Sequence, residues 1–175
     1  MWTVTMGSTG GLATSTVNAV KVIVQAAADI WGWYLDDSLA NIQIRTDIVS
    51  LDSGVLATGG ADFFLDHKKS GYEYYAPSPI IELQSGVDSN GSDPDVYIEI
   101  DLNTLLADEY YLTPPVNGVS VGVPSNPVYD LLSVVIHEIG HGLGFISFLP
   151  EGGTDRTLFD QYVTKISKDY YFSGP

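Results

Sequence analysis

The amino-acid sequence predicts an α+β domain in which two long helices pack against a small twisted mixed sheet. Apolar side chains recur at helical spacing between residues 15 and 35, and a second long apolar stretch runs from Val128 to Phe145. Between them, the segments "NIQIRTDIV" and "DPDVYIEIDL" alternate apolar and polar residues, as half-buried strands do. Because the chain has 175 residues and 45% of them are hydrophobic, we expect one domain around one core.

The first long helix is predicted over residues 15–35. The apolar residues that share one side of it are Val17, Val20, Val24, Ala27, Ala28, Trp31 and Leu35. Ser15 or Thr16 is available as the N-cap of this helix. We expect the aromatic side chains near its end, which include Trp33 and Tyr34, to belong to the core.

The middle of the chain predicts strands separated by irregular segments. In "NIQIRTDIV" the three isoleucines point to one face, and residues 52–79 predict an excursion with a short strand at "ADFFLD". Val96–Leu102 is the second half-buried strand, and residues 113–127 form a loop rich in proline and glycine. Because this loop leads directly into the last helix, we expect the strand to lie beside that helix. If the strand is an exposed edge, an extended peptide would add to it as a further strand.

The charge balance and the lack of cysteine exclude several classes of protein. The chain has 22 acidic and 7 basic residues, which gives a net charge of −15. That negative field repels nucleic acid and anionic membranes, so we expect neither as a partner. Without cysteine, disulfides and thiolate metal sites are excluded. The longest apolar run is too short to span a bilayer, and the first residues carry no signal-peptide pattern.

The stretch "VVIHEIGHGLGF", which begins at Val134, carries the residues with the clearest chemistry. His137 and His141 are four positions apart, so on a helix they share one face and can both reach one tetrahedral zinc ion. Glu138 is offset around the helix, where it can take a proton from a metal-activated water that attacks a carbonyl. The alternative is an apolar helix with two core histidines, but buried ionisable groups need partners, and a metal supplies one.

Two glycines in this stretch add local expectations. A glycine inside a helix costs about 1 kcal/mol relative to alanine, so we expect Gly140 to allow the close approach of another backbone. Gly144 stands three residues after His141, where a helix can end in a left-handed turn. The helix is therefore expected to end near Gly144.

The stretch "HEIGHGLGF" resembles the active-site helix of zinc-dependent metalloproteases, the zincins, and its H-E-x-x-H-x-x-G part is similar to the metzincin pattern. The order of "AAADIWGWYLDDSLANIQIRTDI", "DSNGSDPDVYIEI", "SVVIHEIGHGLGFIS" and "LFDQYV" is similar to a family of secreted bacterial metalloproteases. This resemblance implies a zincin-like fold and an extracellular protein. It also implies His137 and His141 as zinc ligands and Glu138 as the catalytic base.

The third zinc ligand is left open by the sequence. The metzincin pattern places a histidine or aspartate three residues after its glycine, and that position holds Ser147, which is not a credible ligand. Asp160 is a candidate further along, with a helix-capping or structural carboxylate as the favoured alternative. Glu151 and Asp155 are two other downstream acids. His67 lies far from the motif and is expected to be a solvated loop residue.

In the family that the chain resembles, the third histidine and a methionine-containing turn are expected further on. Methionine occurs here only at positions 1 and 6. We therefore expect residues 1–175 to be a single metalloprotease catalytic domain that is truncated. Its C-terminal part, with the third ligand and that turn, would then follow Pro175.

A second metal site is suggested by the oxygen-rich stretch "DSNGSDPD". Its side chains could hold calcium, which prefers oxygen ligands. The residues concerned are Asp88, Asn90, Asp93 and Asp95. The alternative is a plain turn, the usual structure of such clusters. Zinc is therefore the expected cofactor, and calcium a further candidate.

Two functions remain open from the sequence. The first is a zinc-dependent endopeptidase that hydrolyses peptide bonds of protein or peptide substrates, with a metal-activated water and Glu138 as general base. The second is a non-catalytic or degenerate extracellular zincin-like module that binds partners. The intact Glu138 favours the first, whereas the absent third ligand favours the second for this chain. Cleavage specificity and oligomeric state do not follow from the sequence.

Overall fold

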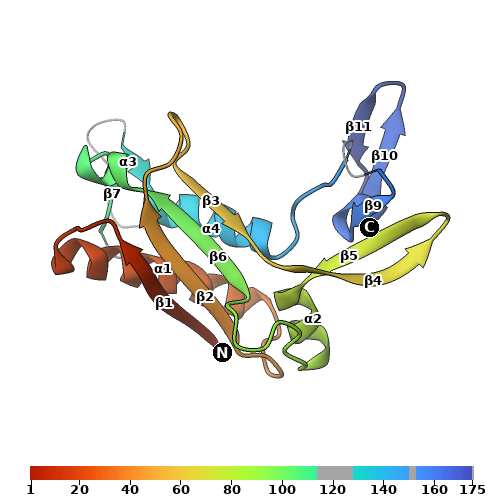
Figure 1. The fold of residues 1–175 in the computed structure, drawn as a ribbon, viewed down its shortest axis with the longest axis horizontal. Coiled ribbons are helices and arrows are strands. Elements are labelled where there is room, and N and C mark those ends of the chain that lie inside the picture. The colour runs from red at the N-terminus through yellow and green to blue at the C-terminus, as the bar shows by residue number, and fades with distance from the viewer. Residues whose placement is uncertain (114–127, 150–152, 175) are drawn as a thin grey trace.

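The computed structural model of the protein describes residues 1–113, 128–149 and 153–174, and Figure 1 shows its mixed α and β structure. In chain order the elements are β1 (Trp2–Thr9), α1 (Thr14–Tyr34), β2 (Ile42–Val49), β3 (Ala57–Gly60), β4 (Phe63–Lys69), β5 (Tyr72–Pro77), α2 (Ser78–Ser85), β6 (Val96–Asp101), α3 (Leu102–Leu106), β7 (Tyr110–Tyr111), β8 (Tyr129–Asp130), α4 (Leu131–Gly142), β9 (Asp155–Thr157), the 3-10 helix η1 (Phe159–Tyr162), β10 (Val163–Ile166) and β11 (Asp169–Phe172).

The main sheet has four strands in the order β1-β2-β6-β3. β1, β2 and β6 run parallel, whereas β3 pairs antiparallel with β6, so the sheet is mixed as predicted. α1 packs against β1, α4 packs against β3 and β6, and the two helices contact each other. They therefore cover the same face of the sheet (Figure 1). The predicted α+β class, with two long helices on a small mixed sheet, is confirmed.

The core lies between this sheet and the two helices. α1 begins and ends one residue before the predicted bounds, and its apolar side is buried along most of its length. The largest fully buried side chains of the two predicted strands are Ile42, Ile44, Ile48, Val96, Ile98 and Ile100. Alternation therefore identified the inward faces of both strands, because successive side chains of a strand point to opposite sides.

Two expectations about α1 are wrong. Its N-cap is Ala13, which makes no side-chain capping hydrogen bond, rather than Ser15 or Thr16. Trp33 and Tyr34 are 81% and 76% exposed, so they lie outside the core. The two rings stack on each other, with their centroids 5.8 Å apart. They follow the last buried residue of the helix, Ala28.

Two expectations about the strands are also corrected. The segment predicted as an irregular excursion contains β3, β4 and β5. β6 lies beside α4 as expected, but it is central, paired with β2 on one side and β3 on the other. Its backbone therefore cannot accept a further strand. In the described residues β1 and β3 are the two edge strands of this sheet, and β3 packs against α4.

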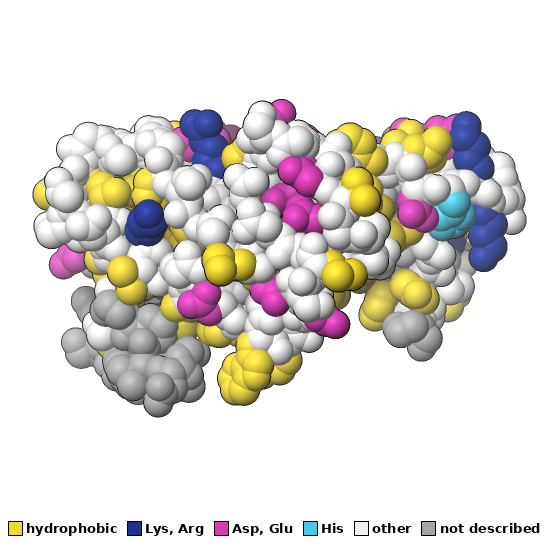
Figure 2. Space-filling model, turned by 90° about the horizontal axis from the view of Figure 1, so that it is seen from below, with side chains coloured by type: hydrophobic (Ala, Val, Ile, Leu, Met, Phe, Trp, Pro, Cys, Tyr) yellow, Lys and Arg dark blue, Asp and Glu magenta, His cyan; other side chains and the backbone are white. Residues whose placement is uncertain are grey.

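Two smaller sheets lie together at one end of the molecule, and a third, of β7 and β8, lies near α3 (Figure 1). β4, β5 and β9 make a three-stranded sheet, and β10 and β11 form a hairpin that rises beside it (Figure 1). On the face shown in Figure 2, carboxylates are more frequent than basic side chains, in keeping with the net charge of −15. In the described ranges, none of the helices has the length and apolarity needed to cross a membrane.

Asp101 joins the end of β6 to the start of α3. Its carboxylate accepts the backbone N–H of Leu51 at 3.0 Å and of Thr104 at 2.8 Å, and the Thr104 hydroxyl at 2.7 Å. Burial alone would raise the pKa of this carboxyl, but the hydrogen bonds outweigh burial and lower the pKa to about 2. Asp101 therefore holds the turn between the sheet and α3 in its charged form.

We expect Asp101→Ala to lower the free energy of unfolding by about 2–4 kcal/mol, because four donors lose their acceptor, the Asn103 side-chain amide at 3.2 Å among them. The folded pKa lies below the unfolded value, so this stabilisation is present above about pH 4 and is lost as the pH falls through about 2. Urea unfolding measures both effects. The exposed Glu109→Ala is the control, and a wild-type advantage that did not shrink between pH 4 and 2 would contradict this account.

Candidate metal centre

The helix that carries the two motif histidines begins at Leu131 because Asp130 caps it. The Asp130 side chain accepts the backbone N–H of Ser133 at 3.1 Å, which satisfies one amide of the first turn. The helix ends after Gly142, and Gly144 has a φ of 92°, a conformation that glycine adopts readily. The predicted left-handed turn at Gly144 is confirmed, although α4 is shorter than the apolar stretch.

The imidazoles of His137 and His141 lie together on one face of α4. Their centroids are 4.5 Å apart and their planes are nearly perpendicular, at 84°. His141 Nδ1 is 2.9 Å from the carbonyl oxygen of Phe145. Because a carbonyl only accepts, Nδ1 carries the proton and Nε2 keeps its lone pair. A backbone bond of this kind orients metal-ligating histidines, so the pair fits two ligands of one zinc ion.

Glu138 is buried, at 8% exposure, in contrast to the exposed ring of His137. The two residues line one side of a cavity of about 480 Å³, whose other side is formed by residues 54–57. Burial raises the pKa of the Glu138 carboxyl, and the neighbouring His141 and His137 partly oppose that rise. A desolvated carboxylate beside two metal-type ligands has the surroundings of a general base.

The edge strand β3 approaches the backbone of α4 at Gly59. A Cβ atom at Gly59 would lie 2.2 Å from the carbonyl oxygen of Glu138, whereas one at Gly60 would meet nothing within 4 Å. Gly140, where we expected a backbone contact, faces the Trp31 ring instead, at 3.7 Å from an added Cβ. That expectation is wrong, and the glycine that lets two backbones meet here is Gly59.

Substitution of Gly59 tests this contact. We expect Gly59→Ala to lower the free energy of unfolding by about 1–3 kcal/mol, because β3 must move away from α4 to admit the methyl group. Gly60→Ala is a matched control from the same strand, and it should change stability by less than about 1 kcal/mol. Chemical denaturation measures both. Equal losses in the two variants would rule out a specific clash at Gly59.

Asp160 is buried in η1, and both of its carboxylate oxygens accept hydrogen bonds. Oδ1 accepts from the hydroxyl of Ser147, the residue at the metzincin ligand position. Oδ2 accepts the backbone N–H of Phe148 at 3.1 Å and of Thr157 at 2.8 Å. The carboxylate thereby joins the segment after α4 to η1. These contacts fit a structural carboxylate, which the sequence analysis gave as the alternative to a zinc ligand for Asp160.

No third metal-type side chain joins His137 and His141 among the residues that the structure describes. Asp160 is not brought into one cluster with them, and neither is His67. His67 lies on β4 and not in the expected loop; its ring stacks on Tyr74, and its Nδ1 atom is 2.6 Å from a carboxylate oxygen of the preceding aspartate. Glu151 lies outside the described residues.

The predicted calcium stretch is brought together only in part. Asp88 and Asp95 approach each other, but their third partner is Glu82 of α2, and Asp93 does not belong to the cluster. Sequence reasoning missed Glu82. The available signal was a single acid between two apolar residues of a short helix, in "PIIELQ". Its burial, at 5% exposure, comes from packing against segments far away in sequence.

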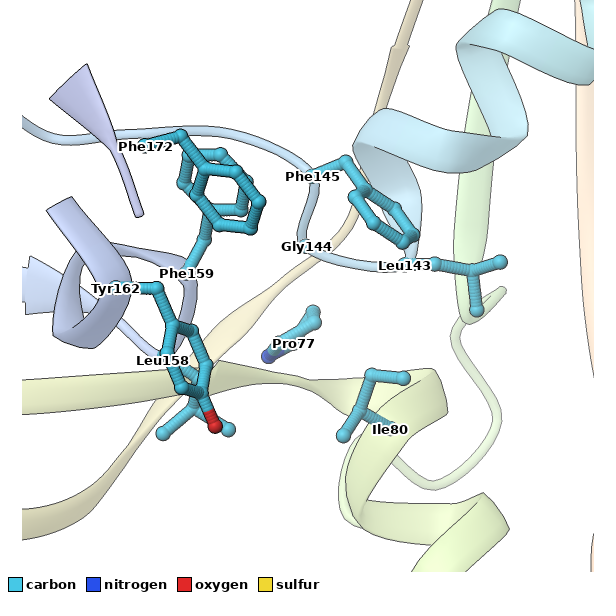
Figure 3. Close-up of a pocket in the computed structure, with 9 residues that line it drawn as sticks. All are labelled: Pro77, Ile80, Leu143, Gly144, Phe145, Leu158, Phe159, Tyr162 and Phe172. Atoms are coloured by element: carbon cyan, nitrogen blue, oxygen red, sulfur yellow. The ribbon is translucent and has the colours of Figure 1, made fainter. Parts of the chain in front are cut away.

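A second cavity, of about 310 Å³, opens beside the C-terminal end of α4 (Figure 3). Its lining is almost entirely apolar and comes from α2, the turn after α4, η1 and β11. The lining residues are Pro77, Ile80, Leu143, Gly144, Phe145, Leu158, Phe159, Tyr162 and Phe172. No local pattern in the sequence predicts this cavity, because its walls are separated by most of the chain. A concave apolar surface next to a candidate metal site suits a substrate side chain.

The fold and the site define an α+β domain whose second long helix presents two histidines and a buried glutamate. Comparison of the chain with protein-family models, with curated proteins and with solved structures gives no match. The function is therefore inferred below from the site itself.

Proposed function

We propose that the protein is a zinc-dependent endopeptidase. The observation that carries this proposal is the pair of imidazoles 4.5 Å apart on one face of α4, with a buried carboxylate directly between them in sequence. His137 and His141 would hold the zinc, His141 through the nitrogen that its bond to the Phe145 carbonyl leaves free. The resemblance to secreted metalloproteases adds the proposal that the protein acts outside the cell.

Zinc, when bound, supplies a Lewis acid that polarises the scissile carbonyl and makes water more acidic. Glu138 removes a proton from the attacking water as the new C–O bond forms. The same carboxyl then delivers that proton to the amide nitrogen, the C–N bond breaks, and an acid and an amine leave. The raised pKa of Glu138 suits the first of these steps, because a carboxylate with a higher pKa is a stronger base.

The elements around the helix offer places for an extended peptide. β3 pairs with β6 on one side, so its other backbone edge is available for a substrate strand. The contact at Gly59 holds this strand against the backbone of Glu138. The apolar cavity of Figure 3 lies beyond His141, where it could receive an apolar substrate side chain. Protein or peptide substrates fit this arrangement, whereas the negative charge opposes nucleic acid.

The second candidate is a non-catalytic or degenerate extracellular module of the same fold that binds partners. The observation in its favour is that the described residues bring only two metal-type ligands together at the motif. A zinc site with two imidazoles would leave the remaining positions to water and would hold the metal weakly.

Zinc content and casein hydrolysis distinguish the two functions. We expect the wild-type chain, saturated with zinc, to hydrolyse casein slowly, and His137→Ala and His141→Ala to lose both the metal and the activity. His67→Ala is the matched control, because it removes the remaining histidine of the chain and should change neither. Zinc binding without any hydrolysis would favour the binding module. Hydrolysis that survives both motif variants would exclude the proposed centre.

A further inference from the structure

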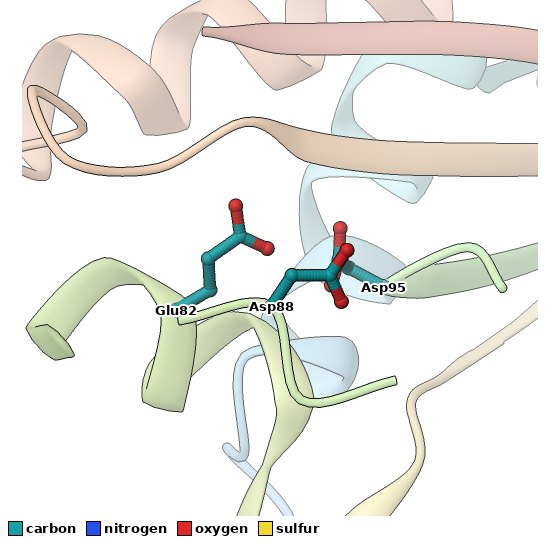
Figure 4. Close-up of side chains that lie close together, drawn as sticks. All are labelled: Glu82, Asp88 and Asp95. Carbon is teal, nitrogen blue, oxygen red and sulfur yellow. The ribbon is translucent and has the colours of Figure 1, made fainter. Parts of the chain in front are cut away.

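Three carboxylates from separate parts of the chain converge at the start of β6. Glu82 comes from α2, Asp88 from the loop after it, and Asp95 directly precedes β6. One oxygen atom of each lies within 4.8 Å of the others, and Figure 4 shows the three groups gathered together. Asp95 is 1% exposed and Glu82 is 5% exposed, whereas Asp88 reaches solvent. Two of the three negative charges are therefore withdrawn from water.

No positive side chain neutralises this cluster in the described part of the chain, since none of its ion pairs includes the three carboxylates. Glu82 and Asp95 instead accept backbone N–H groups, from Asn41 at 2.7 Å and from Gln43 at 2.8 Å. Each of these bonds is made by a neutral donor. They leave the mutual repulsion of like charges in a low-dielectric site without compensation.

Several buried oxygens of this region have no hydrogen-bond partner among the described residues. Asp95 Oδ1 is one of them, although its other oxygen accepts a backbone N–H. In the adjoining loop, Asn90 Oδ1 and Ser89 Oγ are also buried and unpartnered. The Asn90 amide nitrogen donates to the carbonyl oxygens of Asp93 and Pro94, which identifies the other end of the amide as the acceptor. Buried acceptors of this kind are normally satisfied, so the site lacks a positive partner.

We propose that Glu82, Asp88 and Asp95 bind a calcium ion. Calcium takes six to eight oxygen ligands at about 2.3–2.6 Å, so any two of them are at most about 5 Å apart, a limit that this cluster meets. Magnesium retains several of its waters, for which two buried carboxylates leave little room, and zinc prefers nitrogen and sulfur ligands. The unpartnered oxygens of Asn90 and Ser89 are candidates for further positions.

The ion would join α2 and the loop after it to the first residues of β2 and β6. Val96, which follows Asp95, packs beneath the end of α4, since a Cβ atom on Gly142 would lie 2.7 Å from its side chain. Calcium thereby stabilises the part of the sheet on which the helix of His141 rests. The calcium site uses none of the residues of the proposed zinc centre, and it does not depend on peptidase activity.

Protons compete with calcium at this site. Burial raises the pKa of Asp95 to about 6, against the opposing Gln43 N–H and with further contributions from Glu82 and Asp88. Without calcium, the folded chain binds a proton that the unfolded chain releases near pH 4, so stability falls as the pH rises from about 4 to about 6. Calcium affinity rises over the same transition, because the metal binds the ionised carboxylate.

The experiment uses the full chain, freed of metal by a chelator, with calcium chloride as the probe. At pH 7 we expect calorimetric titration to show one calcium per chain. With calcium 100-fold above its Kd, the Tm should rise by about 5–10 °C. Asp88→Asn removes the exposed ligand and should abolish most of that rise. Asp93→Asn makes the same charge change in the same loop, outside the cluster, and should keep it.

Two further variants complete the experiment. Asp95→Asn removes a buried charge, so it should remain folded without metal, lose the calcium response and lose the pH dependence near 6. His137→Ala should keep the calcium response, which separates this site from the zinc centre. The calcium site is overturned if calcium leaves the wild-type Tm unchanged, if Asp93→Asn loses as much as Asp88→Asn, or if magnesium at the same concentration gives an equal rise.

Discussion

Replacing Glu138 with glutamine is expected to lower kcat for peptide hydrolysis by at least about 10²-fold while zinc stays bound. Glutamine has nearly the same shape and fills the same buried position, but its amide cannot take a proton from the attacking water. Glu138 is offset from the face that His137 and His141 share, so the ligand set does not change. Steady-state kinetics on casein, with zinc content measured on the same samples, gives both values.

The stability of this variant provides an internal check. Removing a carboxylate whose pKa is raised by burial should leave the free energy of unfolding unchanged or slightly higher, so a loss of activity cannot be attributed to unfolding. The exposed Glu109→Gln is the matched control and should retain full activity. Near wild-type turnover in Glu138→Gln would remove Glu138 from the role of base. Loss of zinc would instead identify it as a ligand.

The sequence predicted which face of each helix and strand is buried better than it predicted which strands lie next to one another. Ile98 and Ile100 are fully buried as their alternation required, and the helical spacing of Val20 and Val24 placed one side of α1 in the core. Alternation cannot show which strand lies next to which, so it left open whether Val96–Leu102 is an edge strand, and β6 is central in the structure. The first strand, "WTVTMGST", was missed altogether, because its polar and glycine residues give a weak pattern.

In the candidate sites too, contacts between residues close in the sequence could be predicted, whereas contacts between distant residues could not. His137 and His141 are one helical turn apart, so a helix is enough to bring them together. The edge strand "ATGG" has no periodic pattern of apolar residues. It lies at the site because Gly59 allows it to approach the backbone of α4 closely. Glu82 stands 13 positions before Asp95 in the chain and joins it only through the tertiary fold. Contacts of this kind require the structure.

Asp160→Ala is expected to lower the free energy of unfolding by about 3–5 kcal/mol and to leave zinc affinity unchanged. Three donors lose their acceptor together: the hydroxyl of Ser147 and the backbone N–H groups of Phe148 and Thr157. Thr157 is fully buried, so water cannot replace the lost partner there. Because these bonds use both oxygens of Asp160, we infer a structural carboxylate rather than the third zinc ligand.

Urea unfolding and competition with a chromophoric zinc chelator measure the two effects separately. Asp160→Asn keeps one acceptor oxygen and should lose about half as much stability, which leaves a folded chain for the zinc measurement. Asp155→Ala removes a carboxylate from the neighbouring β9 and serves as the control, with a loss below about 1 kcal/mol. A folded Asp160 variant that no longer holds zinc would establish Asp160 as the third ligand after all.

Two imidazoles satisfy only half of a tetrahedral zinc ion, and zinc sites in proteins normally use three or four side chains. If Asp160 is structural, residues 1–175 should therefore bind zinc weakly and hydrolyse peptides slowly. A longer chain that supplies a further histidine or carboxylate after Pro175 should raise both zinc affinity and kcat. Two alternatives are tested here: Asp160 is the third ligand, or the 175-residue chain lacks a third ligand. Both would be contradicted if this chain bound zinc tightly and stoichiometrically and Asp160→Ala did not change the zinc affinity. The third ligand would then have to be sought at His67 or Glu151.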